Sequence, residues 1–162
     1  MPKEASLEDL VVLLADSSLY MRKLTRLMLL YSGVRTIHEV ADGAAALDAI
    51  ETIDPDVMII DWDIEVLSGR EVLRMVRSPD TFSKPNLPVI MLTNVGLQSR
   101  VGTAVRLGAH DILVKPTSPR ALRDRLISIS LAPRPMIRTG NLYIPMPHRR
   151  ADLQDIIENV AS

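Results

Sequence analysis

Val57-Met58-Ile59-Ile60-Asp61 is a run of four apolar residues that ends in a carboxylate. A short, unbroken apolar run, preceded by Pro55 and followed by a loop-like stretch, is typical of a strand buried on both faces of a sheet. An acidic residue that follows such a strand lies at the rim of the sheet, where α/β proteins bind ligands. Taken alone, the pattern is equally well explained by a polar residue that simply ends a strand.

The same pattern recurs along the chain, so several strands are predicted and together they can form a sheet. Three further apolar runs end in a polar residue, namely residues 10–15 before Asp16, 89–92 before Thr93 and 112–114 before Lys115. A short additional strand is predicted over residues 36–40. Helices are predicted after Ser18, over 44–53, after Ser68-Gly69, over 97–107 and over 118–131. Five strands alternating with five helices predict an α/β fold with a parallel sheet and helices on both faces.

The first predicted helix carries an apolar stripe. Leu24, Leu27, Met28 and Tyr31 fall at positions i, i+3, i+4 and i+7, which predicts that this stripe faces the core. The basic residues beside it are then expected on the solvated face.

Composition narrows the class of protein. The 162 residues suit one domain with an appendage, and 47% hydrophobic with 24% charged residues is ordinary for a globular protein. The formal net charge of -1 gives no electrostatic footprint for nucleic acid. No apolar run is long enough to span a bilayer. The absence of cysteine fits a reducing compartment. We therefore expect a cytoplasmic protein with neither a nucleic-acid nor a membrane partner.

The four strand ends bring together residues suited to phosphoryl chemistry. In a parallel sheet all strands point the same way, so Asp16, Asp61, Thr93 and Lys115 are expected on one edge. A carboxylate can accept a phosphoryl group as an acyl phosphate, and Mg²⁺ held by carboxylates can neutralise the transferred charge. Lysine adds a point charge and threonine a hydroxyl. Singly, each residue has a plainer reading, as a helix cap, a strand former or a surface charge.

Residues 7–131 resemble the receiver domain of bacterial two-component response regulators. The matching stretches are LLADSSLYMRKL, VMIIDWDIEVLSG, PVIMLT and GAHDILVKP. The resemblance implies a flavodoxin-like, doubly wound, five-stranded parallel sheet in the order 2-1-3-4-5, with residues 1–131 as the receiver domain. It further implies a sensor histidine kinase or a phosphotransfer protein as partner.

The resemblance also assigns roles to residues of the site. It implies Asp61 as phosphoacceptor, Thr93 as the hydroxyl that moves onto the phosphoryl group and Lys115 as its ion-pair partner. Asp16, Asp61 and the backbone carbonyl of Asp63 would surround Mg²⁺. The peptide bond between Lys115 and Pro116 would be cis.

Two positions depart from the family pattern. Receivers usually carry two adjacent acidic residues after the first strand, but here Ser17 follows Asp16; shifting the alignment by one residue instead pairs Ala15 with Asp16. In either register one acid is missing, so Ser17 is a doubtful ligand and the Mg²⁺ site is expected to be weak, unless the side chain of Asp63 compensates. Ile112 stands where receivers commonly have Tyr or Phe, so no aromatic ring is present to act as a rotamer switch.

Residues 132–162 form a proline-rich arm of different character. Leu142, Tyr143 and Ile144 lie in a candidate short strand. Leu153, Ile156, Ile157 and Val160 give a helical apolar stripe on a short terminal helix that needs a partner surface. Two arrangements stay open: the arm folds back on its own domain, or it reaches across to a second copy and gives a homodimer by exchange. The arm also resembles tails of receivers found beside bacteriophytochrome kinases.

Three functions fit this sequence. The first is a single-domain response regulator that accepts a phosphoryl group on Asp61 and signals through protein contacts or a phosphorelay, since the residues after the receiver are too few for a DNA-binding domain. It would catalyse only its own phosphorylation and would not be an enzyme. The second is a pseudo-receiver that acts as an interaction or dimerisation module. The third is a phosphatase of the haloacid-dehalogenase type, suggested by Asp61-Trp62-Asp63.

Overall fold

The chain has an α/β fold, and the computed structural model describes residues 6–94, 98–131 and 133–146. One sheet holds five parallel strands in the order β2-β1-β3-β4-β5, which is the flavodoxin-like order that the resemblance implied. Its strands are β1 (Val11–Ala15), β2 (Thr36–Val40), β3 (Val57–Asp61), β4 (Val89–Thr93) and β5 (Asp111–Val114). The helices are α1 (Leu19–Tyr31), α2 (Gly43–Ile53), α3 (Gly69–Arg77), α4 (Gln98–Leu107) and α5 (Pro119–Leu131), and a 3-10 turn, η1 (Leu7–Asp9), precedes β1.

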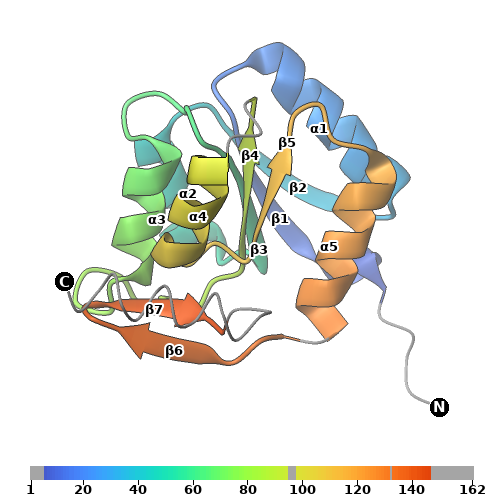
Figure 1. Cartoon of the computed structure of the whole chain (residues 1–162). Helices are drawn as coiled ribbons and strands as arrows, with labels where there is room; N and C mark the ends of the chain where they lie inside the picture. The colour runs from blue at the N-terminus through green and yellow to red at the C-terminus, as the bar shows by residue number, and fades with distance from the viewer. Residues whose placement is uncertain (1–5, 95–97, 132, 147–162) are drawn as a thin grey trace.

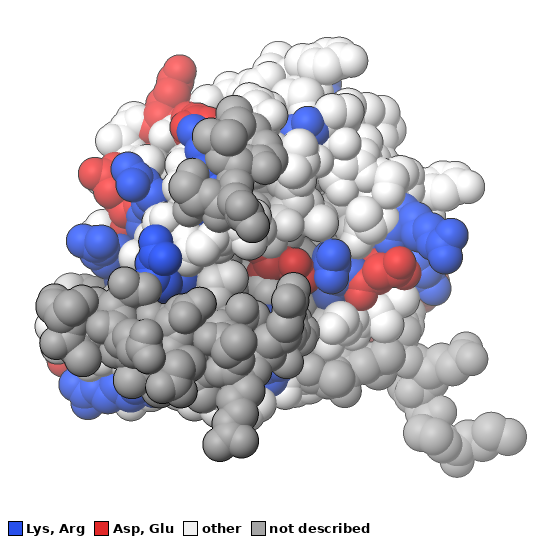
Figure 2. Space-filling model, viewed as in Figure 1, with Lys and Arg blue, Asp and Glu red and all other residues white. Residues whose placement is uncertain are grey.

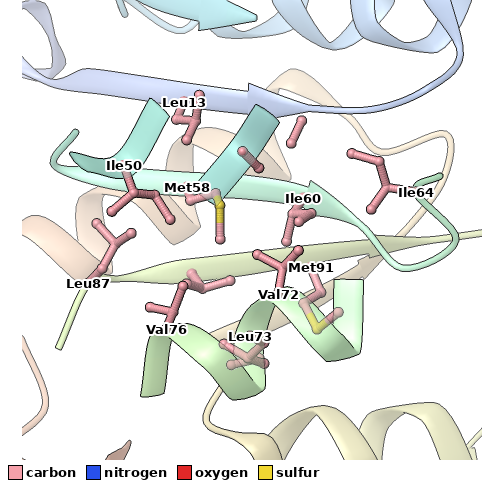
Figure 3. Packing of buried hydrophobic residues seen from close by; sticks show 14 of the residues in the cluster. Leu13, Ile50, Met58, Ile60, Ile64, Val72, Leu73, Val76, Leu87 and Met91 are labelled. Carbon is pink, nitrogen blue, oxygen red and sulfur yellow. The ribbon is translucent and has the colours of Figure 1, made fainter. Parts of the chain in front are cut away.

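The helices form two layers around the sheet. Figure 1 shows α1 and α5 on one face and α2, α3 and α4 on the other. Because side chains alternate along a strand, each central strand feeds both layers. Met58 and Ile60 pack in the cluster beneath α2 and α3, which Figure 3 shows, while Val57 and Ile59 pack beneath α1 and α5. None of the helices in the described ranges is long and apolar enough to cross a membrane.

Two glycines let the loop after β3 approach its neighbours closely. A Cβ on Gly43 would lie 2.1 Å from the carbonyl oxygen of Leu67, and one on Gly69 would lie 2.7 Å from the carbonyl oxygen of Asp61. Ser68 then begins α3 with a capping box, in which its side chain and that of Glu71 each bond to the other's backbone N–H. The end of β3 is thereby held in a defined position.

The predicted core stripe of α1 is wrong in part. Leu27 is 63% exposed and Tyr31 is 85% exposed, whereas the fully buried positions of the helix are Thr25 and Leu29. Apolar residues occur all round this helix, so its periodicity fits more than one inward face. Only packing against the sheet and α5 selects the face.

The described part of the arm folds back on its own domain. β6 (Met136–Thr139) and β7 (Leu142–Pro145) form an antiparallel hairpin, and β7 contacts α3 and α4. Ile144 is fully buried, and Leu142 packs against the main core. The hairpin that contains Leu142, Tyr143 and Ile144 therefore packs on its own domain.

The rest of the arm prediction falls on residues that are not described. Leu153, Ile156, Ile157 and Val160 lie outside the described residues.

Figure 1 shows the hairpin at the amino-terminal ends of the sheet strands, away from the edge where those strands end. The hairpin is thus remote from the candidate site.

Candidate functional site

An ion-paired lysine joins the ends of β1, β3 and β5. The Nζ atom of Lys115 lies 3.0 Å from Oδ2 of Asp16 and 3.1 Å from Oδ1 of Asp61. All three side chains are buried, with Asp16 1%, Asp61 6% and Lys115 8% exposed. Thr93 ends β4 between them, and its carbonyl accepts a hydrogen bond from the backbone N–H of Lys115 at 2.7 Å. The structure therefore gathers the four predicted strand-end residues at one edge.

The carboxylate of Asp61 is held in an unfavourable environment for its charge. Burial raises the pKa of Asp61 above its ordinary value; Lys115 opposes the rise, and the carboxylate of Asp16 adds to it. Oδ1 of Asp61 is buried and has no hydrogen-bond partner among the described residues. Its 3.1 Å contact with Lys115 lacks hydrogen-bond geometry, so we treat it as an electrostatic contact only. Asp61 is thus the group of the site that is least satisfied by the protein.

Asp16, by contrast, is fully engaged. Its Oδ1 accepts a hydrogen bond from the backbone N–H of Ser18 at 2.9 Å, and its Oδ2 accepts one from Lys115 at 3.0 Å. The hydroxyl of Ser17 accepts a hydrogen bond from the backbone N–H of Glu65 at 2.9 Å, so it ties β1 to the loop after β3.

The structure also places Arg100 at the site, a residue that no sequence pattern singled out. From the first turn of α4, its Nη1 donates to the hydroxyl oxygen of Thr93 at 2.8 Å and pairs with Oδ2 of Asp63 at 3.1 Å. Its guanidinium also lies 5.1 Å from the ring centre of Trp62, within cation–π range. No sequence signal separates this arginine from the many others, because only the tertiary fold brings α4 over the end of β3.

The donor set suits a hard cation but supplies few ligands. Mg²⁺ prefers oxygen ligands, and the buried Oδ1 of Asp61, which accepts no hydrogen bond from the described residues, is such a group beside Asp16. The described residues nevertheless contain no cluster of three His, Cys, Asp or Glu side chains that could hold a metal ion. The residues present therefore fit Mg²⁺ with two carboxylates and backbone oxygen, without a third acid.

Two remaining predicted residues lie beside the site. The Lys115–Pro116 peptide bond is cis, as the resemblance implied. Ile112 is half-buried on β5 and packs against the core cluster beneath α2, α3 and α4.

A groove on the surface lies apart from this site. A groove of about 710 Å³ lies between α3 and α4 and is lined by Ser68, Arg70, Glu71, Arg74, Thr103, Arg106 and Leu107. Figure 2 shows basic side chains gathered over this part of the surface. None of the four strand-end residues lines the groove, so the groove is separate from the site that those residues form.

The strand order and the helices on both faces define a flavodoxin-like α/β domain with paired carboxylates at one edge of its sheet, and comparison with known proteins identifies the family. Residues 12–127 match the family described as response regulator receiver domain. The chain belongs to this family. Receiver domains are signalling proteins and not enzymes in the usual sense.

Relatives and solved structures agree with this family. The chain is 30% identical over 116 residues to chemotaxis protein CheY1 of Helicobacter pylori, covering 71% of this chain and 92% of that protein. It is similar to the chemotaxis response regulator CheY4 of Vibrio cholerae, with 29% identity, a TM-score of 0.63 and coverage of 72% and 95% of the two chains. The receiver domain of sensor histidine kinase PA1611 from Pseudomonas aeruginosa, with 27% identity, a TM-score of 0.63 and coverage of 76% and 96%, holds a magnesium ion in its active site cleft.

The family match removes the phosphatase alternative. The haloacid-dehalogenase reading of Asp61-Trp62-Asp63 needed a further strand with an acidic pair after Lys115. In the described part of the chain, β5 is followed by α5 and by an antiparallel hairpin that does not join the parallel sheet. The DxD pattern arises instead because a strand-end aspartate is followed by a short acidic loop.

Proposed function

We propose that this receiver accepts a phosphoryl group on Asp61 from a sensor histidine kinase or a phosphotransfer protein. The observation that carries the proposal is the ammonium of Lys115 between the carboxylates of Asp16 and Asp61, with Thr93 at the end of the neighbouring strand. Output would then pass through protein contacts or onward phosphotransfer.

In this proposal each residue has a separate task. An oxygen of Asp61 attacks the phosphorus of a phosphohistidine; the new O–P bond forms as the P–N bond breaks, and the electron pair leaves with the imidazole. Lys115 supplies positive charge beside the new acyl phosphate. The hydroxyl of Thr93 donates a hydrogen bond to a phosphoryl oxygen. Because Asp61 attacks as a carboxylate, its raised pKa favours reaction at neutral pH over reaction in acid.

Mg²⁺ is proposed as the cofactor of this transfer. Asp16, Asp61 and the backbone carbonyl of Asp63 are the groups that would hold it, and it would neutralise charge on the phosphoryl oxygens. With Ser17 in place of a second acid, we propose a weak site. The carboxylate of Asp63 pairs with Arg100, so in this arrangement it does not make up for the missing ligand.

The test is incubation with a small acyl phosphate donor and Mg²⁺, followed by intact-mass measurement. We expect one added phosphoryl group on the wild type and none on Asp61→Asn, and no added mass on the wild type when Mg²⁺ is chelated before the donor is added. Phosphorylation of Asp61→Asn at the wild-type level would move the acceptor to another residue and contradict the proposal.

The second candidate is a pseudo-receiver that acts without phosphorylation. It is favoured by the lack of a three-residue acidic cluster among the described residues. The same mass measurement separates the two: a wild type that takes up no phosphate over a range of Mg²⁺ concentrations would support the pseudo-receiver.

Assembly is a separate proposal. We propose that any exchange of the arm between two copies involves residues 147–162, because the hairpin packs on its own chain. Light scattering on the full chain and on a chain ending at Met146 tests this proposal. If both proteins have the same number of chains per particle, no dimer is held together by these residues. The link to bacteriophytochrome kinases and the cytoplasmic location stay predictions.

A further inference from the structure

Arg100 connects α4 to the proposed phosphorylation site through two acceptors. Its Nη1 lies 2.8 Å from the hydroxyl oxygen of Thr93 and 3.1 Å from Oδ2 of Asp63, and its Nη2 lies 3.5 Å from Oδ1 of Asp63. The side chain of Arg100 is 23% exposed, while that of Asp63 is 53% exposed. The side chain of Arg100 is therefore mostly shielded from water, while its ion pair with the exposed carboxylate of Asp63 is weak.

A phosphoryl group on Asp61 would compete for this guanidinium. It would add negative charge next to Thr93, which is one hydrogen bond from Arg100. Arginine binds phosphate oxygens strongly, and an ion pair with an exposed carboxylate is worth little. Arg100 would gain more from the phosphoryl charge than it would lose by leaving Asp63.

The position of Arg100 gives this exchange a structural consequence. It lies in the first turn of α4, two residues after the helix begins, so a shift of its side chain bears directly on the start of that helix. Ile112 has no ring that could couple the site to the surface. A charged side chain on α4 supplies a different route.

We propose that Arg100 is a positioning residue that couples α4 to the charge on Asp61, by moving from Asp63 toward the phosphoryl group while keeping its hydrogen bond to Thr93. The inference rests on the proposed function, since it needs an anion on Asp61. It adds a residue, a helix and a direction of movement to that function.

The chain contains its own reporter for this movement. Trp62 is the single tryptophan, and the guanidinium of Arg100 lies 5.1 Å from its ring centre. A cation over an indole ring perturbs its fluorescence, so displacement of Arg100 changes the emission of Trp62. A second guanidinium, that of Arg70, lies 5.8 Å from the same ring and provides a constant background.

The experiment uses beryllofluoride, which adds to an aspartate carboxylate in place of a phosphoryl group, at saturating Mg²⁺. Binding and Trp62 emission are measured for the full-length wild type, Arg100→Gln, Arg100→Lys and a matched control, Arg106→Gln. Arg106 lies on the same helix, and its side chain donates to Thr103 instead of the site. Thermal melts of all variants establish that they fold.

The expected results differ by variant. Arg100→Gln binds beryllofluoride about tenfold more weakly, because one charge-assisted contact is lost, and its Trp62 emission no longer responds to binding. Arg100→Lys retains affinity within about threefold of wild type, because it keeps the charge but not the forked geometry. Arg106→Gln behaves as the wild type in both measurements.

Asp63→Asn gives the opposite sign and separates coupling from a packing role. Removing the competing carboxylate frees Arg100, so beryllofluoride binds about threefold more tightly, the size expected for one exposed ion pair. In the double variant Asp63→Asn/Arg100→Gln this gain disappears, because there is no guanidinium to release. A merely structural role for Arg100 predicts that both single variants weaken binding.

The outcomes distinguish this inference from the function it rests on. If the wild type binds no beryllofluoride and takes up no phosphate, the proposed function fails and the coupling fails with it. If the wild type binds but folded Arg100→Gln matches it in affinity and in Trp62 response, only the role of Arg100 is overturned.

Discussion

The hydroxyl of Ser17 accepts a hydrogen bond from the backbone N–H of Glu65 at 2.9 Å. Most receivers would carry an acidic residue at this position, as the resemblance in the sequence implies. Here the side chain joins the end of β1 to the loop after β3, and the site is left with the carboxylates of Asp16 and Asp61. Fewer charged ligands mean weaker binding of a hard cation.

We therefore expect Ser17→Asp to raise Mg²⁺ affinity by about tenfold, because the substitution adds one charged ligand. An aspartate can also accept the hydrogen bond from Glu65, so the loop should be retained. Isothermal calorimetry measures the change. Ser18→Asp is the matched control, because it adds the same charge one residue further on and keeps a good N-cap for α1; equal gains from both variants would contradict a ligand role for position 17.

Asp61→Asn should stabilise the protein at neutral pH. The pKa of Asp61 is raised by burial above its ordinary value of 3.8, so the folded state binds a proton more readily than the unfolded state. The stability that protonated Asp61 contributes is therefore lost as pH rises from 3.8 through the raised pKa. Above that pKa the ionised carboxylate lowers the free energy of unfolding. Asparagine removes that cost, which we place on the order of 1 kcal/mol.

The pH dependence checks the cause. Urea unfolding of both proteins should show the variant more stable at neutral pH and the difference vanishing below pH 3.8, where Asp61 is protonated in both states. A difference that persists unchanged into acid would point to packing and not to charge.

Ile144→Ala should destabilise the domain although it lies in the arm. Ile144 is fully buried against Gly108, whose added Cβ would lie 3.0 Å from its Cγ2. Loss of a buried isoleucine side chain costs about 3 kcal/mol. The neighbouring variant Arg138→Ala, at an exposed position of the same hairpin, should change stability by less than about 0.5 kcal/mol. A negligible effect of Ile144→Ala on thermal unfolding would mean that the hairpin is not part of the cooperative fold.

Val66→Gly should stabilise the loop beside the site. Val66 has φ +71° and is 75% exposed, so a β-branched residue occupies a left-handed conformation without a buried contact to require it. Glycine relieves the strain at some entropic cost, leaving a gain of at most about 1 kcal/mol. Val101→Gly, inside α4, should instead destabilise by about 1 kcal/mol. Thermal melts compare the two variants. If Val66→Gly lowers the melting temperature as Val101→Gly does, Val66 is not strained.

Much of the fold followed from local pattern. The apolar runs that became β1, β3 and β4 are unbroken because both of their faces are covered, and this is visible without coordinates. The meeting of Asp16, Asp61, Thr93 and Lys115 followed in turn, since parallel strands end at one edge. The strand order came from the family resemblance and not from pattern alone.

Other features depended on contacts between distant residues. The inward face of α1 was misassigned because apolar residues occur around the whole helix, and only the sheet and α5 decide which of them are buried. The strand β6 went unrecognised because its few residues gain their structure from pairing with β7. The contact of β7 with α3 and α4 was equally hidden, because nothing local to the arm specifies the surface that receives it.

What the sequence alone determined is the set of strand-end groups and the edge they share, because alternation of strands and helices dictates both. What only the tertiary structure decided is which other groups reach that edge. Arg100 pairs with Thr93 and Asp63, and Ser17 bonds to Glu65, across separations of 7, 37 and 48 residues. The reason is that a side-chain contact depends on the distance between folded elements, and local periodicity carries no information about that distance.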